Sequence, residues 1–123
     1  MGLDNYASRS PGDVVLSPED EEVFASAGVE LCGGIVSGDG GSSFRGKVYL
    51  DVVDRVAGVS LGQEWIAPEE IHRIWVAFER ADEQSVAAEA EGDHYPVTVE
   101  EVEQLRAFFR ICAERDLGLI GWW

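Results

Sequence analysis

The chain has 123 residues, with 24 Asp or Glu, 9 Lys or Arg, and a formal net charge of −15 at pH 7. Apolar residues make up 46% of the chain, which is enough for one folded domain with one modest core. The excess of acid argues against a nucleic-acid binder that works through phosphate contacts, because such a protein needs a basic stripe, and it also argues against docking on anionic lipid.

The cysteines and the chain ends bear on the compartment. Cys32 and Cys112 are far apart in the sequence, with no CxxC motif and no companion histidine at ligand spacing. We expect Cys112 to pack as a small apolar side chain and Cys32, which precedes two glycines, to be more exposed. No basic and apolar leader opens the chain, and no apolar run reaches the roughly 18 residues of a membrane span. The sequence therefore predicts a cytoplasmic protein with reduced thiols.

The first third of the chain predicts an arm followed by a helix. Residues 1–12 are polar and rich in Ser, Pro and Gly at their end, which predicts a flexible N-terminal arm ahead of a single globular domain over residues 13–123. Ser17 and Pro18 then mark a helix start, because Ser is a good cap and Pro suits the first helical position. We expect this helix to stop at Gly28.

The next segment allows more than one structure. Residues 29–36, interrupted by two glycines, predict a short β-hairpin or a turn, and a loop rich in Gly and Ser follows. From Phe44 to Val56 apolar residues recur every four positions, which favours a helix. The β-branched content of residues 46–53 would also suit a strand, and that alternative stays open.

The C-terminal half predicts two helices and an apolar end. Pro68 opens a helix that fades near residue 82, and residues 82–97 form an acidic connection. A capping box at Thr98 starts the last helix. Residues 117–123 hold no polar side chain, and we expect the terminal tryptophan pair to fold back onto the core, with an anchor in a partner interface as the alternative.

These elements predict a mainly α fold. It is a compact single domain of about four helices, with a short β-hairpin near residues 29–36 as an optional addition. The alternative is an α+β fold that keeps residues 46–53 as a strand.

The sequence offers no catalytic constellation. Its histidines are His72 and His94, and both are expected to face solvent. His94 follows Glu91 and Asp93, but this spacing is a weak metal motif beside the expectation of an exposed loop. No HExxH, EF-hand, P-loop or nucleophile-elbow motif occurs. We therefore expect neither an enzyme nor a metal or cofactor.

The acids are concentrated in the two flanks of the chain. Residues 1–43 carry eight acids against one base and residues 81–123 carry ten against three, whereas residues 44–80 carry six against five. Solubility alone would explain such charge, and helix-start preference explains part of the row at residues 19–22. A functional interpretation is that carboxylates meet and steer a basic partner. The candidate partner-binding residues are Glu89, Glu91, Asp93, Glu100, Glu101, Glu103, Trp122 and Trp123.

Small size, acidity and an abundance of tryptophan make the chain similar, as a class and without a shared motif, to bacterial immunity proteins, antitoxins and phage-coded inhibitors. This resemblance implies a small acidic cytoplasmic inhibitor that occludes a basic partner protein, such as a toxin or a nucleic-acid-binding protein, without binding nucleic acid or membrane itself. One alternative is a phage-type DNA mimic, whose acids stand in for phosphates. Another is a small ligand-binding domain or enzyme, which predicts a deep pocket near Trp65, Trp75 or His94.

Overall fold

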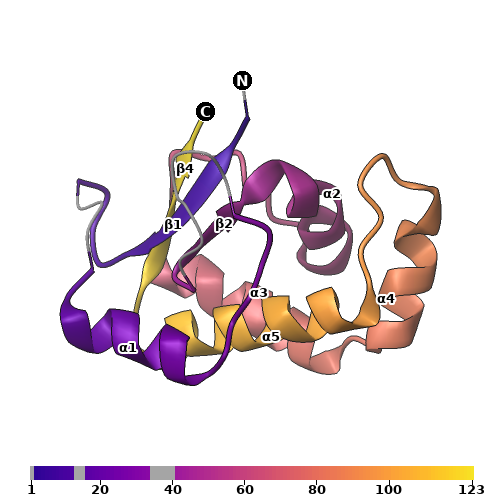
Figure 1. Ribbon diagram of the computed structural model, residues 1–123. Helices are drawn as coiled ribbons and strands as arrows, with labels where there is room; N and C mark the ends of the chain where they lie inside the picture. Colours follow the sequence, from indigo (N-terminus) through magenta and orange to yellow (C-terminus); the bar gives the residue numbers. More distant parts are fainter. Residues whose placement is uncertain (1, 13–15, 34–40) are drawn as a thin grey trace.

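A four-stranded antiparallel sheet and five α-helices form the part of the chain that the computed structural model describes, namely residues 2–12, 16–33 and 41–123 (Figure 1). The elements in chain order are β1 (Asp4–Ser8), α1 (Pro18–Ser26), β2 (Ser43–Arg45), α2 (Gly46–Ala57), β3 (Trp65–Ile66), α3 (Pro68–Arg80), α4 (Glu83–Glu89), the 3₁₀ turn η1 (Ala90–Gly92), α5 (Val99–Glu114) and β4 (Gly118–Trp122). The strands lie in the order β2-β1-β4-β3. The fold is therefore α+β. The predicted mainly α class is confirmed in part, because the helices form but a four-stranded sheet accompanies them.

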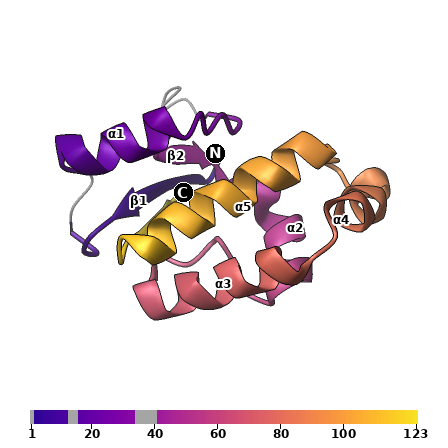
Figure 2. The same cartoon turned by 90° about the horizontal axis from the view of Figure 1, so that it is seen from below.

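Helices α1, α3 and α5 lie on one side of the sheet. Figure 2 shows them in front of β1 and β2, with α4 at one end of the molecule. Alternate strand residues point toward these helices, and Ala7, Phe44, Ile66 and Leu119 are each at most 2% exposed. The rings of Phe44 and Phe108 meet edge to face, with centroids 5.0 Å apart. Because burying one Phe side chain contributes about 1.5–3 kcal/mol, these rings stabilise the packing of the helices on the sheet.

The predicted N-terminal arm is wrong for residues 4–8, which form the inner strand β1. This strand pairs with β4 on one side and with β2 on the other. Its polar residues predicted a solvated arm. In the structure Asn5 is buried, and its Nδ2 donates to the carbonyl oxygens of Leu61 (3.1 Å) and Ile120 (3.3 Å). The partners of the Nδ2 group lie 56 and 115 positions away, where no local pattern reveals them, and Oδ1 has no hydrogen-bond partner among the described residues.

Two predicted helix starts are confirmed by their caps. Helix α1 begins at Pro18, and the Oγ of Ser17 accepts a hydrogen bond from the backbone N–H of Asp20. The chain leaves this helix through Gly28, whose φ of +68° favours glycine. Helix α5 begins with the predicted capping box between Thr98 and Glu101.

The segment with two possible structures is a helix. Helix α2 covers residues 46–57, so the strand alternative for residues 46–53 is wrong. It ends at Gly58, which has a φ of +68°. The predicted hairpin at residues 29–36 does not form over residues 29–33, which contain no strand, and residues 34–36 lie outside the described residues.

The connection between α3 and α5 is more helical than predicted. It contains α4 and η1, and Asp82 caps α4 by accepting a hydrogen bond from the backbone N–H of Ser85. The guanidinium of Arg106 on α5 holds the end of α3, because its Nε donates to the carbonyl oxygen of Phe78 (3.0 Å) and its Nη2 to that of Ala81 (2.8 Å). These contacts join three consecutive helices.

The apolar C-terminal segment forms the inner strand β4, between β1 and β3. Leu119 and Ile120 are buried, as expected for an apolar segment that folds back onto the domain. The two terminal rings are not buried, because Trp122 is 52% exposed and Trp123 is 55% exposed. The expectation that the tryptophan pair packs in the core is therefore wrong.

Candidate functional site

Glu101, one of the predicted partner-binding acids, is used inside the fold. Its Oε1 accepts from the backbone N–H of Thr98 (3.1 Å), and its Oε2 accepts from the hydroxyl of Tyr49 (2.8 Å). The hydroxyl oxygen of the fully buried Tyr49 in turn accepts from the backbone N–H of Cys32 (2.9 Å). Burial raises the pKa of Tyr49, and the Glu101 carboxylate raises it further. Glu101 is thus a structural residue that ties α5 to α2.

Asp93 is also engaged within the chain. Both of its carboxylate oxygens accept from Nη2 of Arg55 on α2, at 2.9 and 3.0 Å. The hydrogen bond to Asp93 raises the pKa of the Arg55 guanidinium, and the nearby carboxylates of Asp93, Glu89 and Asp51 add to that rise. This ion pair fixes the loop after η1 against α2, so Asp93 is not a free contact for a partner.

The remaining four predicted acids are exposed and lie on elements that contact one another, and we call them together the acidic end. They lie on α4, η1 and the first turns of α5, at the end of the molecule opposite α1 (Figure 1). None of the four forms an ion pair with another described residue. The acidic end consists of Glu89, Glu91, Glu100 and Glu103.

The terminal tryptophans lie elsewhere. The C-terminus emerges beside the N-terminus, away from α4, in both Figure 1 and Figure 2. The indole Nε1 of Trp123 donates to the carbonyl oxygen of Gly62 (3.0 Å), and the ring of Trp122 lies 6.1 Å from that of Tyr6. The structure therefore divides the predicted site into two separate surfaces, one acidic and one aromatic.

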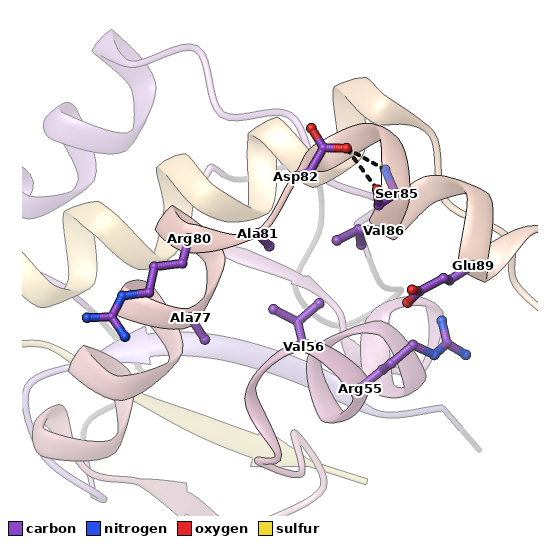
Figure 3. Close-up of a pocket in the computed structure, with 9 residues that line it drawn as sticks. All are labelled: Arg55, Val56, Ala77, Arg80, Ala81, Asp82, Ser85, Val86 and Glu89. Carbon is purple, nitrogen blue, oxygen red and sulfur yellow. Dashed lines mark hydrogen bonds between the residues drawn. The ribbon is translucent and has the colours of Figure 1, made fainter.

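A groove of about 440 Å³ opens between α2, α3 and α4 (Figure 3). Its floor is apolar, and both basic and acidic side chains lie at its edge. The Arg55 and Arg80 side chains point away from each other, and Asp82 accepts from the Oγ of Ser85 (2.9 Å), so the drawn polar groups do not converge on one point. The floor residues are Val56, Ala77, Ala81 and Val86. Because three helices contribute only two or three lining residues each, no sequence motif predicts this groove.

A second groove of about 420 Å³ lies where the start of α3 meets the end of α5, and His72 and Asp116 are among its lining residues. Neither groove is lined by Trp65, Trp75 or His94, where the ligand-binding or enzyme alternative placed a deep pocket. Within the described residues, no group of three or more His, Cys, Asp or Glu side chains is arranged to hold a metal ion.

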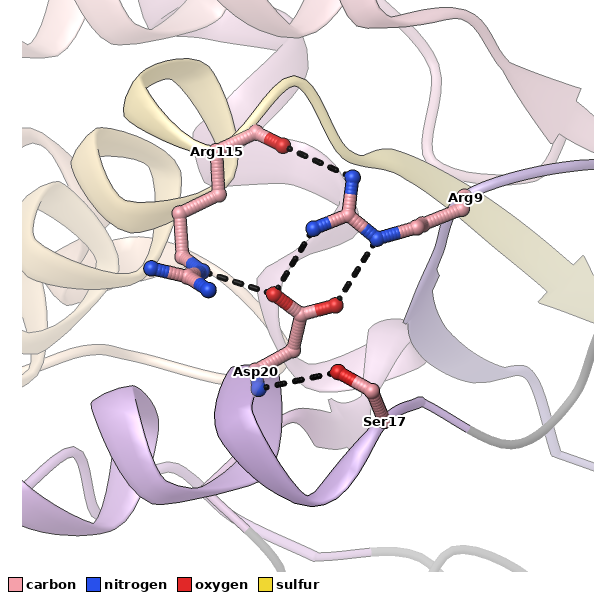
Figure 4. Close-up of polar contacts among 4 residues, drawn as sticks. All are labelled: Arg9, Ser17, Asp20 and Arg115. Atoms are coloured by element: carbon pink, nitrogen blue, oxygen red, sulfur yellow. Dashed lines mark hydrogen bonds and ion pairs between the residues drawn. The ribbon is translucent and has the colours of Figure 1, made fainter.

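Asp20, from the acidic row at residues 19–22, is fully buried (Figure 4). Its carboxylate accepts from Nε (2.9 Å) and Nη2 (2.9 Å) of Arg9 and from Nε of Arg115 (2.7 Å). Burial by itself raises the pKa of Asp20, but the hydrogen bonds from Arg115 and Arg9 outweigh it and hold the pKa below its usual value. This cluster joins the end of β1, helix α1 and the end of α5, and the Asp20 carboxylate within it is inaccessible to solvent.

Comparisons of the chain with protein-family models, with curated proteins and with solved structures give no match. None of the helices in the described ranges combines the length and the apolar character that crossing a bilayer requires.

Proposed function

We propose that this protein is a small acidic binding protein that occludes a basic partner protein, in the manner of an immunity protein or antitoxin. The observation that carries the proposal is the acidic end: four exposed carboxylates, without an ion pair to the described residues, on a chain with a net charge of −15. A surface of this kind attracts a cationic protein and repels nucleic acid and anionic lipid.

Most arginine side chains are engaged in ion pairs, which leaves less positive charge to neutralise the acidic end. Arg9, Arg55, Arg106, Arg110 and Arg115 are held in ion pairs with carboxylates. The last three are all the bases of residues 81–123, the segment that carries the acidic end. The acidic end therefore has no uncommitted base within its own segment, and Arg55, which lies near Glu89, is paired with Asp93.

Occlusion needs no chemistry from the inhibitor. Carboxylates that lie in a basic cleft compete with the anionic substrate of that cleft, and long-range attraction raises the rate of association. In the DNA-mimic form of this proposal, the partner is a DNA-binding protein, and DNA would compete with this protein for it. The shared prediction is that affinity depends strongly on salt.

The proposal is tested by affinity capture from the native host, followed by binding kinetics with the purified partner. We expect a basic protein, a dissociation constant that rises about tenfold or more between 50 and 500 mM NaCl, and slower association after Glu91→Gln, Glu100→Gln and Glu103→Gln are combined.

The matched control combines Glu64→Gln, Glu69→Gln and Glu79→Gln. It removes the same charge from exposed positions outside the acidic end. We expect the control to slow association less than the test variant. An acidic or neutral partner, or affinity that does not change with salt, would contradict the proposal.

A further inference from the structure

One face of the sheet has no described helix over it, since α1, α3 and α5 all pack on the other face (Figures 1 and 2). Residues opposite each other in antiparallel strands point to the same face. The register places Tyr6 opposite Ile120 and Ile120 opposite Trp65, so one row crosses three strands. Together with Trp122, these three residues form what we call the aromatic face.

Trp122 is the exposed ring of the aromatic face, whereas Tyr6 and Trp65 are partly buried and the Tyr6 hydroxyl is buried without a hydrogen-bond partner among the described residues. Trp122 is 52% exposed, while Ile120 beneath the rings is 8% exposed. The ring planes of Tyr6 and Trp122 are tilted by 52°. A Cβ at Gly118 would collide with the ring of Trp65, so the absence of a side chain there lets this indole lie against β4. The face is thus a preformed platform of rings, and little ordering entropy remains to be lost on binding.

A negative charge lies at the edge of this platform. Asp4 is directly opposite Trp122 in the register, is 6% exposed, and its Oδ1 has no hydrogen-bond partner among the described residues. Burial and the charge of Asp4 both raise the pKa of Tyr6. Arg45 is opposite Asp4 on β2, but its guanidinium lies beside Gly2 and forms no ion pair with Asp4.

The net charge of the chain decides which occupant fits the aromatic face. A second copy of the chain would bring together two molecules of −15 each, and a phosphate or an anionic lipid would meet the same repulsion. Aromatic faces, those of tryptophan above all, attract the guanidinium and ammonium groups of Arg and Lys. A neighbouring carboxylate favours the same groups.

We propose that the aromatic face anchors the basic partner by stacking its arginine or lysine side chains on Trp122 and Trp65. This inference rests on the proposed function and refines it, because it separates two tasks. The acidic end draws the partner in and sets the association rate, whereas the aromatic face holds it and sets the dissociation rate.

The test uses the full chain labelled with ¹⁵N and a hexa-arginine peptide with blocked ends as the probe, in 20 mM NaCl. We expect saturable shifts of the indole Nε1–H resonances of Trp122 and Trp65 and of the backbone amides of β1 and β4. Trp122→Leu should weaken binding at least about fivefold, since it removes one cation–π platform. A hexaglutamate peptide should cause no shifts.

Tyr95→Leu is the matched control, because it removes an exposed ring (36% exposed) outside the aromatic face, and its affinity should stay within about twofold. Unfolding temperatures measured on both variants confirm that each is folded. Shifts confined to the acidic end, with Trp122→Leu binding like the wild type, would overturn the aromatic anchor and leave the proposed function standing. Absence of any binding would overturn both. A concentration-dependent dimer that Trp122→Leu abolishes, seen by analytical ultracentrifugation, would assign the face to a second copy instead.

Discussion

The side chain of Asp20 shows how an acidic protein uses its few bases. Its carboxylate is inaccessible to solvent, and it is compensated by Arg9, which is 52% exposed, and by Arg115, which is 29% exposed. A buried carboxylate without such partners would be protonated or would destabilise the fold. The pair of arginines therefore allows α1 to dock on the end of α5 with a charge in between.

We predict that Asp20→Asn lowers the free energy of unfolding at pH 7 by about 1.5–3 kcal/mol, the range for hydrogen bonds to a charged group, because the half-exposed Arg9 regains water. The pKa of Asp20 is lowered on folding. Its contribution is therefore present above the pKa of the unfolded chain, about 4, and is lost as the pH falls through the lower folded pKa. Urea unfolding at pH 7 and pH 3 measures both effects.

The control for this variant is Glu114→Gln, which removes an exposed ion pair with Arg110 and should cost less than about 0.5 kcal/mol. If Asp20→Asn were as stable as the control at pH 7, the buried cluster would not contribute to stability. A difference between wild type and Asp20→Asn that did not shrink toward pH 3 would contradict the lowered pKa.

Tyr49 is the second residue whose polar atom stabilises the interior. Tyr49→Phe should cost about 1–2 kcal/mol, because it leaves the N–H of Cys32 and an oxygen of Glu101 without their partner. Since folding raises the pKa of Tyr49, the folded state keeps its proton when the unfolded chain has lost it, and this contribution falls as the pH rises above about 10. Absorbance titration of the phenolates, compared with the same titration of Tyr49→Phe, follows this group.

The expected curve for the folded wild type lacks a Tyr49 step near pH 10, and the step returns on unfolding. Tyr95→Phe is the control, since Tyr95 is 36% exposed and lies outside this cluster. A wild-type titration identical to that of Tyr49→Phe plus one ordinary tyrosine would contradict the burial of this hydroxyl.

At the scale of elements, the helices were predictable because their stop and start residues are local. Ser17, Pro68 and Thr98 stand where caps and first turns require them, and the structure confirms each start. In α2, the apolar residues recur every four positions, as expected of a helix packed on one face, and this spacing predicted the structure better than the β-branched content did. Each of these decisions needed only a few neighbouring residues.

The sheet was not predictable in the same way. Strand β1 has a buried asparagine whose partners are Leu61 and Ile120, and β4 is apolar on both faces and shows no alternation. The internal partners of two predicted site residues were hidden for a related reason. Glu101 and Asp93 are acids in the sequence, but Tyr49 and Arg55, which engage them, lie 52 and 38 positions away. Long-range pairing decided both outcomes.

The position of β1 yields a prediction about truncation. Deleting residues 2–8 removes a strand that pairs on both edges, leaving β4 and β2 without their shared neighbour. We expect the truncated chain to lose cooperative thermal unfolding, measured by circular dichroism. A flexible arm would instead allow the deletion with little change, so native spectra and a sharp transition in the truncated chain would contradict the observed sheet.

At the scale of the whole molecule, the same charge that supports binding works against folding. Carboxylates on a chain of −15 repel one another more strongly when the chain is compact, so the fold carries an electrostatic cost that salt reduces. The ion pairs of Asp20 and Asp93 with arginines offset part of this cost at two junctions between elements. The four acids of the acidic end form no ion pair with another described residue, so their mutual repulsion lies on the surface proposed to meet the partner.

The unfolding temperature should therefore rise by roughly 3–6 °C between 10 and 500 mM NaCl at pH 7, which corresponds to about 1 kcal/mol for a domain of this size. Combining Glu91→Gln, Glu100→Gln and Glu103→Gln should raise the unfolding temperature at 10 mM NaCl and reduce the further gain from salt, because the repulsion is then already smaller. Near pH 4.2, the isoelectric point of the sequence, the gain should vanish in both proteins. Differential scanning calorimetry measures all four conditions. A variant destabilised at low salt would mean that these acids stabilise the fold, and their exposure would then need an explanation other than attraction to a basic partner.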